Sequence, residues 1–227
     1  MITGGGTGIG RAVASRLVAA GDQVVLLGRR PEKLADAVAE LGPASRAMPV
    51  DATDPAALQA ALGELPERVD VLINAAGGNT DLVDGAPAAD DLKAVRDSWS
   101  ANFEANVLSA VLVTHALLPR LADDARIVNL GSVTARSGQG SYGAVKAALE
   151  PWTSELAFQL GSRGITANVI SPGRPPSGAD PESGRCHRRG SRHCRQSIVD
   201  PANQLAVNII CRDSQVAMNF EIVTGRD

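Results

Sequence analysis

The stretch TGGGTGIG, residues 3–10, decides the fold of this chain. Two apolar residues, Met1 and Ile2, precede it, and a stretch with helical spacing of its apolar residues, 8–20, begins inside it. Glycines at such a place let the backbone turn tightly and approach a phosphate, while the free N–H groups of the helix start hold the negative charge. The stretch therefore predicts a phosphate-binding loop between a strand and a helix, with an ordinary flexible turn as the alternative.

Outward from this turn, short runs rich in β-branched residues alternate with longer stretches of helical spacing. The runs are 23–28, 46–50, 69–74, 125–131 and 164–171, and the helical stretches are 8–20, 31–41, 55–63, 90–121 and 141–161. Continuous apolar strands separated by helices are typical of a parallel sheet covered on both faces. The sequence therefore predicts an α/β fold, a doubly wound parallel sheet (Rossmann fold) with three layers, α/β/α, that binds ligands at the carboxyl ends of its strands. Pro151 is expected to bend or break the last helix.

Composition and charge narrow the class of protein. The 227 residues carry a net charge of −3 with 44% hydrophobic and 21% charged residues, which fits a soluble globular chain. The slightly acidic balance argues against nucleic acid or an anionic membrane as a partner. Apolar runs end well before ~18 residues, no basic and then apolar leader is visible, and three cysteines do not make a disulfide framework. We therefore expect a cytoplasmic protein without a membrane span.

The composition changes after Gly173. We expect a Rossmann-type domain over 1–173 and an atypical, partly disordered segment over 174–227, because 174–197 is rich in Arg, Pro, Gly and Ser and has no apolar periodicity. Residues 202–223 regain apolar character without a clean period.

Two cysteines and two histidines in this segment could in principle bind zinc tetrahedrally; they are Cys186, His187, His193 and Cys194. Their spacing is not a usual zinc-finger pattern and the segment lacks a hydrophobic scaffold, so we expect no metal site.

The second strand ends in Gly28, Arg29 and Arg30, where a site for NAD would place an acidic residue on the ribose hydroxyls. A guanidinium suits a 2′-phosphate, because it offers a planar and permanently charged fork. The sequence therefore favours NADP over NAD. The alternative is that both arginines form a solvated face at the start of a helix.

The only tyrosine, Tyr142, lies four residues before Lys146, one of three lysines. On a helix over 141–161 the two side chains share a face. An ammonium beside a phenol favours the phenolate and lowers the phenol pKa from about 10, as proton transfer near neutral pH requires. On spacing alone, a half-buried tyrosine and a surface lysine placed by chance remain the simpler reading.

Other polar groups are expected at the same edge of the sheet. Ser132 ends the strand of IVNLGS (127–132), and the strand of LINAAG (72–77) ends in Asn74 and a small turn. Ser137 and Ser141 also lie near the tyrosine in sequence, but Ser132 alone ends a strand.

With these pieces in order, the chain resembles the classical short-chain dehydrogenases/reductases, and it is similar to their 3-oxoacyl-[acyl-carrier-protein] reductases except in its tail. The matching motifs are TGGGTGIG, NAAG (74–77), Asn106, Ser132, Tyr142-xxx-Lys146 and SPG (171–173), and they cover about three quarters of the chain.

The resemblance implies a catalytic set. Tyr142 would be the general acid or base, Lys146 would lower its pKa and bind the nicotinamide ribose, and Ser132 would donate to the substrate oxygen. Asn106 would support a water-linked proton relay, with Asn102 as a fallback. The implied cofactor contacts are Gly4, Gly6, Thr7, Gly8, Ile9, Gly10, Arg29, Arg30, Asp51, Ala52, Asn74, Ala75, Gly77, Tyr142, Lys146, Pro172 and Gly173.

The implied activity is NAD(P)-dependent interconversion of a carbonyl and an alcohol on a small molecule, with NADP preferred. Two alternatives stay open: a dinucleotide-binding protein without turnover, and a defective fragment of such an enzyme. The family's habit of pairing two long helices, here 99–121 and 141–161, implies a homodimer or homotetramer.

The sequence departs from the family in three places. Ser132 and Tyr142 are ten residues apart, and the loop between them is a few residues shorter than the family usually has. Gly138 and Gly140 are therefore expected to close the turn. The first strand is short of the usual five or so residues, which suggests a start further upstream. The segment after Gly173 reads like translation of a shifted reading frame.

Overall fold

The computed structural model of the chain describes residues 1–84, 87–88, 90–138 and 140–172, together with the backbone of three strands within 194–222. The chain divides into two units, Met1–Pro172 and Gly173–Asp227.

The first unit is built on a six-stranded parallel sheet in the order β3-β2-β1-β4-β5-β6. Its strands are β1 (Ile2–Thr3), β2 (Val24–Gly28), β3 (Ser45–Pro49), β4 (Val69–Asn74), β5 (Leu121–Leu130) and β6 (Thr166–Ile170). The predicted doubly wound α/β fold is confirmed.

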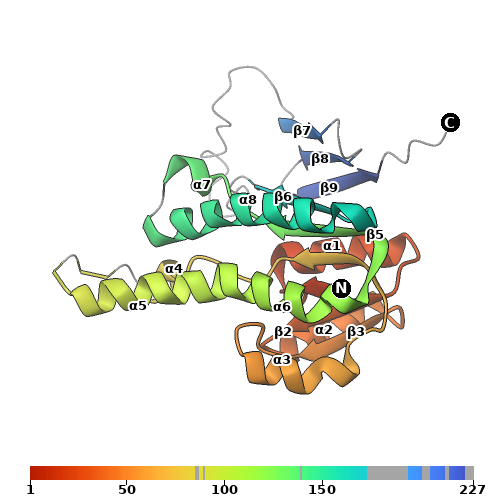
Figure 1. Cartoon of the computed structure of the whole chain (residues 1–227), viewed down its shortest axis with the longest axis horizontal. Coiled ribbons are helices and arrows are strands. Elements are labelled where there is room, and N and C mark those ends of the chain that lie inside the picture. Colours follow the sequence, from red (N-terminus) through yellow and green to blue (C-terminus); the bar gives the residue numbers. More distant parts are fainter. Residues whose placement is uncertain are drawn as a thin grey trace. The chain divides into compact units, whose positions relative to one another are not determined.

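Helices alternate with these strands (Figure 1). They are α1 (Gly8–Ala19), α2 (Pro31–Leu41), α3 (Pro55–Ala61), α4 (Asp81–Asp84), α5 (Leu92–Phe103), α6 (Ser109–Leu117), α7 (Thr134–Ser137) and α8 (Gly140–Leu160), with short 3₁₀ turns at Leu62–Glu64, Leu118–Arg120 and Gly161–Arg163. α1 packs on α2, and α3 packs on α6, so the sheet is covered by helices on both faces.

The order of the strands reverses between β1 and β4. From β1 the chain builds outward through β2 and β3, and it then returns to the other side of β1 to build β4, β5 and β6. The carboxyl ends of β1 and β4 are therefore a topological switch point, where sheets of this kind bind ligands. Although β1 has two residues, both pair with β2 and β4, and Ile2 and Thr3 are fully buried.

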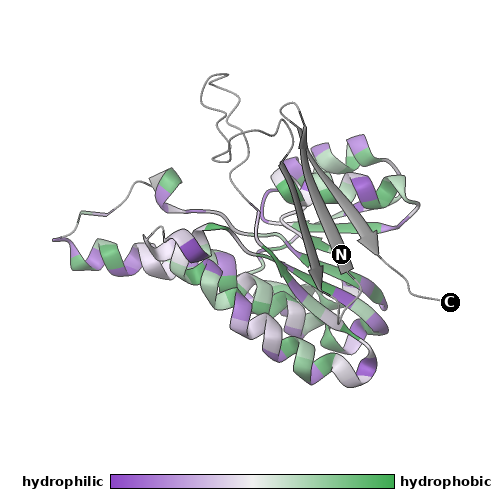
Figure 2. Cartoon of the chain, turned by 90° about the horizontal axis from the view of Figure 1, so that it is seen from above, coloured by the Kyte–Doolittle hydropathy of each residue, from purple (hydrophilic) through white to green (hydrophobic). Residues whose placement is uncertain are grey.

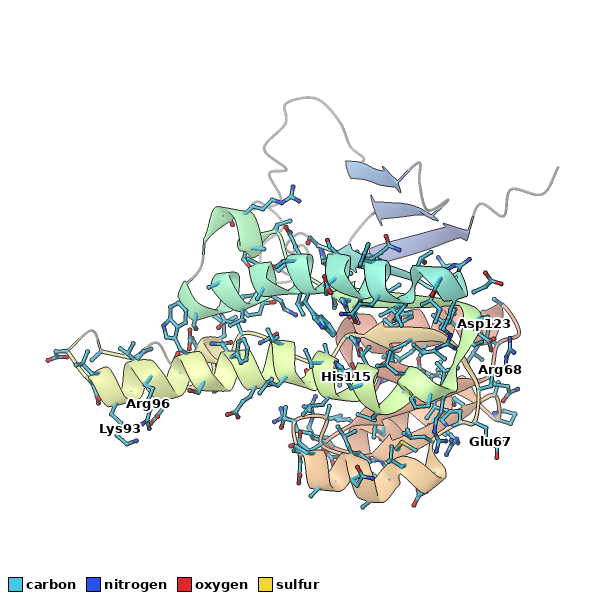
Figure 3. All side chains as sticks on the ribbon, in the orientation of Figure 1. Glu67, Arg68, Lys93, Arg96, His115 and Asp123 are labelled. Atoms are coloured by element: carbon cyan, nitrogen blue, oxygen red, sulfur yellow. The ribbon has the colours of Figure 1, made fainter. Side chains whose placement is uncertain are left out.

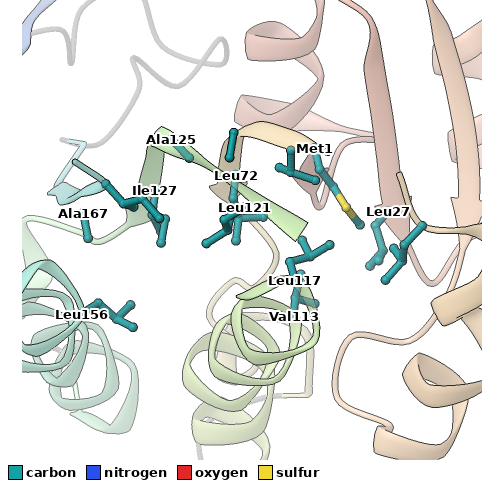
Figure 4. Packing of buried hydrophobic residues seen from close by; sticks show 14 of the residues in the cluster. Met1, Leu27, Leu72, Val113, Leu117, Leu121, Ala125, Ile127, Leu156 and Ala167 are labelled. Carbon is teal, nitrogen blue, oxygen red and sulfur yellow. The ribbon is translucent and has the colours of Figure 1, made fainter. Parts of the chain in front are cut away.

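The main apolar core lies between the sheet and the helices α3, α6 and α8. Figure 4 shows the aliphatic side chains of β4, β5 and β6, with Leu72, Ile127 and Ala167 among them, above Val113 and Leu117 of α6 and Leu156 of α8. Hydrophobic residues line the strands, and each helix carries both hydrophobic and hydrophilic residues (Figure 2), which is the pattern of helices with one buried face.

Three details differ from the expected elements. The helix expected over 90–121 contains a wide π turn at Glu104–Leu108, between α5 and α6. β5 begins at Leu121 rather than at 125, so the strand follows the helix directly. Pro151 does not break its helix, because α8 runs through it to Leu160; Pro151 is exposed, so water can reach the carbonyl that loses its donor.

One helical stretch, Leu92–Arg120, is long and apolar enough to cross a membrane. It also contains Asn102 and Asn106, which are buried within the fold, and its residues Val113 and Leu117 belong to the sheet core. These contacts are those of a core helix.

The second unit contains an antiparallel sheet of three strands, β7 (Cys194–Asp200), β8 (Leu205–Arg212) and β9 (Gln215–Ile222), in that order. Most of the segment expected to be disordered, 174–193, and three of the four residues weighed as zinc ligands, Cys186, His187 and His193, lie outside the described residues; of Cys194 the structure describes the backbone alone. The assignment of 174–227 as an atypical, partly disordered region stays a prediction.

Candidate functional site

The glycine turn joins β1 to α1 and fits tightly on one side. Gly4 has φ 67°, and a Cβ there would lie 2.8 Å from the Ala75 carbonyl oxygen in the loop after β4. A Cβ at Gly10 would lie 2.5 Å from the Gly4 carbonyl oxygen. Side chains at either position would push the turn off its neighbours, so both places need glycine.

On its other side the same turn is open. Thr7 and Gly8 are exposed, and a Cβ at Gly8 would have no atom within 4 Å. Thr7 is the N-cap of α1, yet no side chain among the described residues caps the helix, and its first turn has no acidic residue. Gly6 is buried and Ile9 is half-buried beside them. The N–H groups at the start of α1 are therefore available to a phosphate, and the cradle fits a dinucleotide.

Two basic side chains border this cradle. Arg29 and Arg30 follow β2 and are exposed, and the Arg30 guanidinium donates to the Thr7 hydroxyl at 3.3 Å. On the neighbouring strand end, Asp51 Oδ1 accepts from the Thr53 N–H and hydroxyl at 2.9 and 2.8 Å, and Ala52 is buried. The carboxyl ends of β2 and β3 thus carry the groups that the resemblance assigns to the adenosine end of a dinucleotide.

Asn74 ends β4 and is buried, with 4% of its surface exposed. Its Nδ2 donates to Thr114 Oγ1 at 3.0 Å and to Asn129 Oδ1 at 2.8 Å, and Asn129 Nδ2 donates to Thr153 Oγ1 at 2.8 Å. Asn74 Oδ1 has no partner among the described residues. Asn74 therefore fastens β4 to β5 and to helix α6 beneath the rim, which is a supporting role.

Ser132 lies just beyond β5, and its hydroxyl is held by its neighbour. Thr134 donates to Ser132 Oγ twice, from its N–H at 3.2 Å and from its hydroxyl at 2.8 Å. Because Oγ accepts these two bonds, its own proton is left to donate outward. The Ser132 hydroxyl lies near enough to Tyr142 to favour the phenolate, and so acts to lower the pKa of the phenol.

Tyr142 lies in the first turn of α8 and is half-buried. Burial raises its pKa above the ordinary value of 10.0, and the nearby Ser132 hydroxyl offsets part of that rise. We expected Lys146 to lower this pKa. In the structure the opposite direction prevails, because burial of the phenolate outweighs the effect of the Ser132 hydroxyl that favours it.

Lys146 lies one turn further along α8 and is 4% exposed. Its Nζ donates to the Leu130 carbonyl oxygen at the end of β5 at 2.7 Å and lies 5.9 Å from the centroid of the Tyr142 ring. Burial lowers the pKa of Lys146 from 10.5 to about 8. The cation is therefore beside the phenol, as the spacing predicted, but its hydrogen bond goes to the strand.

Asn106 and Asn102 both reach the loop after β4. Asn106, in the π turn, donates from Nδ2 to the Gly78 carbonyl at 2.9 Å and accepts from the Gly78 N–H at 3.0 Å. Gly77, with φ 123°, packs against Asn106 Oδ1. Asn102 accepts from the Thr80 N–H at 3.1 Å. The residue predicted for the relay and its fallback thus hold consecutive parts of one loop.

The loop after β6 is bonded to the segment that follows Ser132. The Val133 N–H, next to Ser132, donates to the Pro172 carbonyl at 3.2 Å. Gly173, also predicted to border the nicotinamide, lies outside the described residues.

Sequence reasoning did not assign a role to Thr134, Asp81 or Ser141. Thr134 follows Ser132 by two positions, and a hydroxyl pair at that spacing is a usable signal. Asp81 and Ser141 carry no such signal, because their partners come from segments far apart in the chain.

Comparison with known proteins agrees with this geometry. The family model described as short chain dehydrogenase matches residues 1–180. The chain is 36% identical over 184 residues to sulfoacetaldehyde reductase 2 of Chromohalobacter salexigens, covering 76% of this chain and 71% of that protein.

Two solved structures are similar. A short chain dehydrogenase of Burkholderia cenocepacia in complex with NADP has a TM-score of 0.67 and 35% identity, covering 76% of this chain and 72% of that one. A 3-ketoacyl-(acyl-carrier-protein) reductase of Brucella melitensis complexed with NADH has a TM-score of 0.64 and 25% identity, covering 76% and 74%.

The glycine cradle at the switch point, the Ser132–Tyr142–Lys146 group beside it and these matches lead to one assignment. The chain belongs to the short-chain dehydrogenase/reductase family of NAD(P)-dependent oxidoreductases, which act on small carbonyl or alcohol substrates.

Proposed function

We propose that the chain is a cytoplasmic, NADP-dependent enzyme that interconverts a carbonyl and an alcohol with Tyr142 as its general acid and base. The observation that carries the proposal is the buried ammonium of Lys146, which is fixed on the Leu130 carbonyl at the end of β5 and lies 5.9 Å from the centre of the Tyr142 ring. The buried cation of Lys146 lies in the next turn of α8. Ser132 follows β5, the strand next to β4, whose carboxyl end borders the switch point, and Tyr142 and Lys146 lie on α8.

The proton step follows from the state of the phenol. Since burial raises the Tyr142 pKa above 10.0, the phenol is protonated near neutral pH and is ready to give its proton to a carbonyl oxygen as that oxygen gains charge. In the reverse direction the phenolate takes the proton of the alcohol. When bound, the nicotinamide supplies or accepts the hydride.

Ser132 stabilises the charge that develops on the substrate oxygen. Thr134 occupies two acceptor positions of Ser132 Oγ, so the Ser132 proton can be directed at an oxygen placed beside Tyr142. A donor oriented before the reaction costs no rearrangement in the transition state.

Lys146 keeps a positive charge near the phenol with little water around it. Its Nζ is fixed on the Leu130 carbonyl, which leaves two ammonium protons for other acceptors. We propose that one of them binds a ribose hydroxyl of the cofactor, while the charge stabilises the phenolate after proton transfer.

The preference for NADP rests on the two arginines after β2. Arg30 is anchored on Thr7 in the phosphate cradle, Arg29 is exposed beside it, and the Burkholderia relative was solved with NADP. We propose that these guanidinium groups bind a 2′-phosphate. The Brucella relative carries NADH, so the two cofactors must be compared directly.

Fluorescence titration with NADPH and NADH, followed by loss of absorbance at the nicotinamide band with a panel of ketones, aldehydes and 3-oxoacyl thioesters, tests the proposal. Tighter binding of NADPH and turnover of at least one carbonyl support it. Binding without turnover across the panel would make the chain a dinucleotide-binding protein, and no binding of either cofactor would mark it as a defective enzyme.

We also propose that the chain forms a homodimer through α5 and α8. A groove of about 430 Å³ runs between them and is lined largely by apolar side chains; its residues are Trp99, Ser100, Phe103, Glu104, Leu108, Ala144, Val145 and Ala148. Trp99 and Phe103 are 48% and 42% exposed. A second copy would bury these aromatic rings, which dominate interface energetics.

Sedimentation velocity distinguishes the states. We expect a dimer for the unmodified chain and a monomer for Trp99→Glu. Arg96→Ala is the control, because Arg96 points away from α8 on the same helix (Figure 3). A monomeric unmodified chain would contradict the dimer.

A further inference from the structure

We propose that Asp81 is a positioning residue that fastens the loop after β4 to the helix turn carrying Tyr142. The proposal rests on Tyr142 being the proton donor of the reaction. It assigns to Asp81, Asn102 and Ser141 a shared role, which we call the Asp81 clasp: a set of hydrogen bonds that fixes the phenol relative to the cofactor loop.

Asp81 is the centre of the clasp, because its two carboxylate oxygens face different elements. Oδ1 accepts from the Ser98 hydroxyl at 2.6 Å and from Asn102 Nδ2 at 3.3 Å, both on α5. Oδ2 accepts from the Ser141 hydroxyl at 3.2 Å on α8. One side chain from the loop therefore ties two helices that are separated by about forty residues.

Asn102 closes the clasp from within the protein. Its side chain is fully buried, and its Nδ2 also donates to Ser141 Oγ at 2.8 Å. Its Oδ1 accepts from the Thr80 N–H, next to Asp81. Both ends of the amide are thus used, one toward the loop and one toward α8. An amide buried in this way is satisfied in one orientation only, which makes the arrangement specific.

Ser141 connects the Asp81 clasp to Tyr142. It is 2% exposed, it is the residue before Tyr142, and its hydroxyl bonds to both Asn102 and Asp81. The backbone next to the phenol is therefore fixed by the bonds of Ser141 to Asn102 and Asp81. A displacement of about 1 Å at a reacting group costs up to about 100-fold in rate, so a clasp here has a kinetic effect.

The clasp acts on the phenol more than on the loop as a whole. Asn106 independently holds Gly78 by two hydrogen bonds, so the loop keeps its attachment to the long helix when Asp81 is lost. Replacing Asp81 should therefore lower kcat while leaving cofactor affinity nearly unchanged. A purely structural residue would instead change both together.

Hydrogen exchange measured on the protein without substrate tests the clasp apart from activity. In Asp81→Ala we expect faster exchange, about tenfold, in the peptide spanning 141–147, and little change in the peptide spanning 78–80, whose Gly78 and Thr80 N–H groups are held by Asn106 and Asn102. Asp97→Asn is the matched control: it removes a carboxylate of α5 that pairs with Lys93 and Arg96, whose side chains point to solvent (Figure 3). The control should leave both peptides unchanged.

Kinetics supply the second arm. We expect kcat of Asp81→Ala to fall about 10- to 100-fold, with the Kd for NADPH within about threefold of the unmodified chain. Asp81→Asn should recover most of the rate, because its oxygen still accepts from Ser98 and its amide can donate to Ser141. In the double variant Asp81→Ala with Ser141→Ala, the loss should not exceed that of the slower single variant.

Each outcome decides between the two proposals. Faster exchange in Asp81→Ala, together with an unmodified chain that binds NADPH but turns nothing over, would keep the clasp and refute the proposed function. Exchange that matches the control in a chain that does turn over would refute the clasp. If Asp81→Ala does not fold, Ser141→Ala carries the same test, since it removes only the bonds to α8; unchanged kcat in that variant would overturn the proposal.

Discussion

The ammonium of Lys146 lies 5.9 Å from the ring centroid of Tyr142, yet it donates its hydrogen bond to the Leu130 carbonyl at 2.7 Å. The lysine is thus anchored by the sheet and presents its charge to the phenol from one side. From the sequence spacing alone, a lysine near the tyrosine is expected to lower the tyrosine pKa. In the structure the charge is near the tyrosine, but burial raises the pKa of the tyrosine nevertheless.

Removal of the phenol hydroxyl should stop the reaction and spare binding. We expect Tyr142→Phe to lower kcat by about 10²- to 10⁴-fold, the usual contribution of a positioned acid, with the fluorescence Kd for NADPH unchanged within about twofold. A Tyr142→Phe protein that keeps full turnover would refute the assignment of the acid.

The raised pKa of Tyr142 sets the pH dependence of each direction. Reduction needs the protonated phenol, so its rate should stay level through neutral pH and fall only as pH rises through the tyrosine pKa. Oxidation needs the phenolate, so its rate should rise over the same range. Initial rates in both directions from pH 6 to 10.5 give the test, and profiles with the opposite slopes would contradict it.

Burial of Lys146 predicts a pH-dependent stability. The folded pKa is about 8 and the ordinary value is 10.5, so above pH 8 the folded protein binds fewer protons than the unfolded chain and is stabilised as pH rises. The lowering of the Lys146 pKa corresponds to roughly 3 kcal/mol. The free energy of unfolding of the unmodified chain should therefore improve, relative to Lys146→Met, between pH 8 and pH 10.

Urea unfolding of both proteins at pH 7, 8, 9 and 10 measures that difference. The other titrating groups are common to both chains and largely cancel. If the free energy of unfolding changed with pH in the same way for both proteins, burial of Lys146 would not lower its pKa, and the prediction would be wrong.

Close packing at Gly143 should matter for Ser132 and Tyr142 together. A Cβ there would lie 2.8 Å from the Thr134 carbonyl oxygen, so Gly143→Ala must push α7 away from α8. We expect a loss of about 1–3 kcal/mol in unfolding free energy and a fall in kcat of at least about tenfold. Gly161→Ala is the control, because a Cβ at Gly161 meets no atom within 4 Å. Equal behaviour of the two variants would argue against this contact.

Cofactor preference should depend on Arg30. We expect Arg30→Ala to weaken NADPH binding about tenfold, the range for loss of one charged contact, and to leave NADH binding within about twofold. Arg68→Ala, which changes an exposed arginine just before β4 (Figure 3), should alter neither. Equal losses for both cofactors would show that Arg30 does not read the 2′-phosphate.

The sequence predicted the sheet and the rim groups because both follow from local patterns. β2 and α2 lie within a residue of the runs expected at 23–28 and 31–41, since a buried parallel strand and a half-buried helix have different periods. Asn74 and Ser132 follow strands that end at the same edge of the sheet, and the four-residue spacing of Tyr142 and Lys146 places both on one face of α8, where Lys146 reaches the end of β5. The chemistry at that edge was therefore readable from residue types and order.

What escaped prediction depends on contacts between distant segments. The wide turn at Glu104–Leu108 accompanies bonds of Asn102 and Asn106 to the loop after β4, which is distant in sequence, so no local pattern of the long helix locates it. The four-residue helices α4 and α7 are too short to show a period. The bonds of Asp81 to Ser98 and Ser141 join residues 17 and 60 positions apart, and no local rule links them.

The wide turn at Glu104–Leu108 also limits how this chain can change in length. Its five-residue bonding places one more residue than an α-helix would between Asn102 and the apolar row of Val113 and Leu117. Loss of a single codon there would give a more regular helix, but it would rotate one half against the other by about 100°. Either the amides would leave the loop or Val113 and Leu117 would leave the sheet, so point substitutions in this turn should be tolerated far better than deletions.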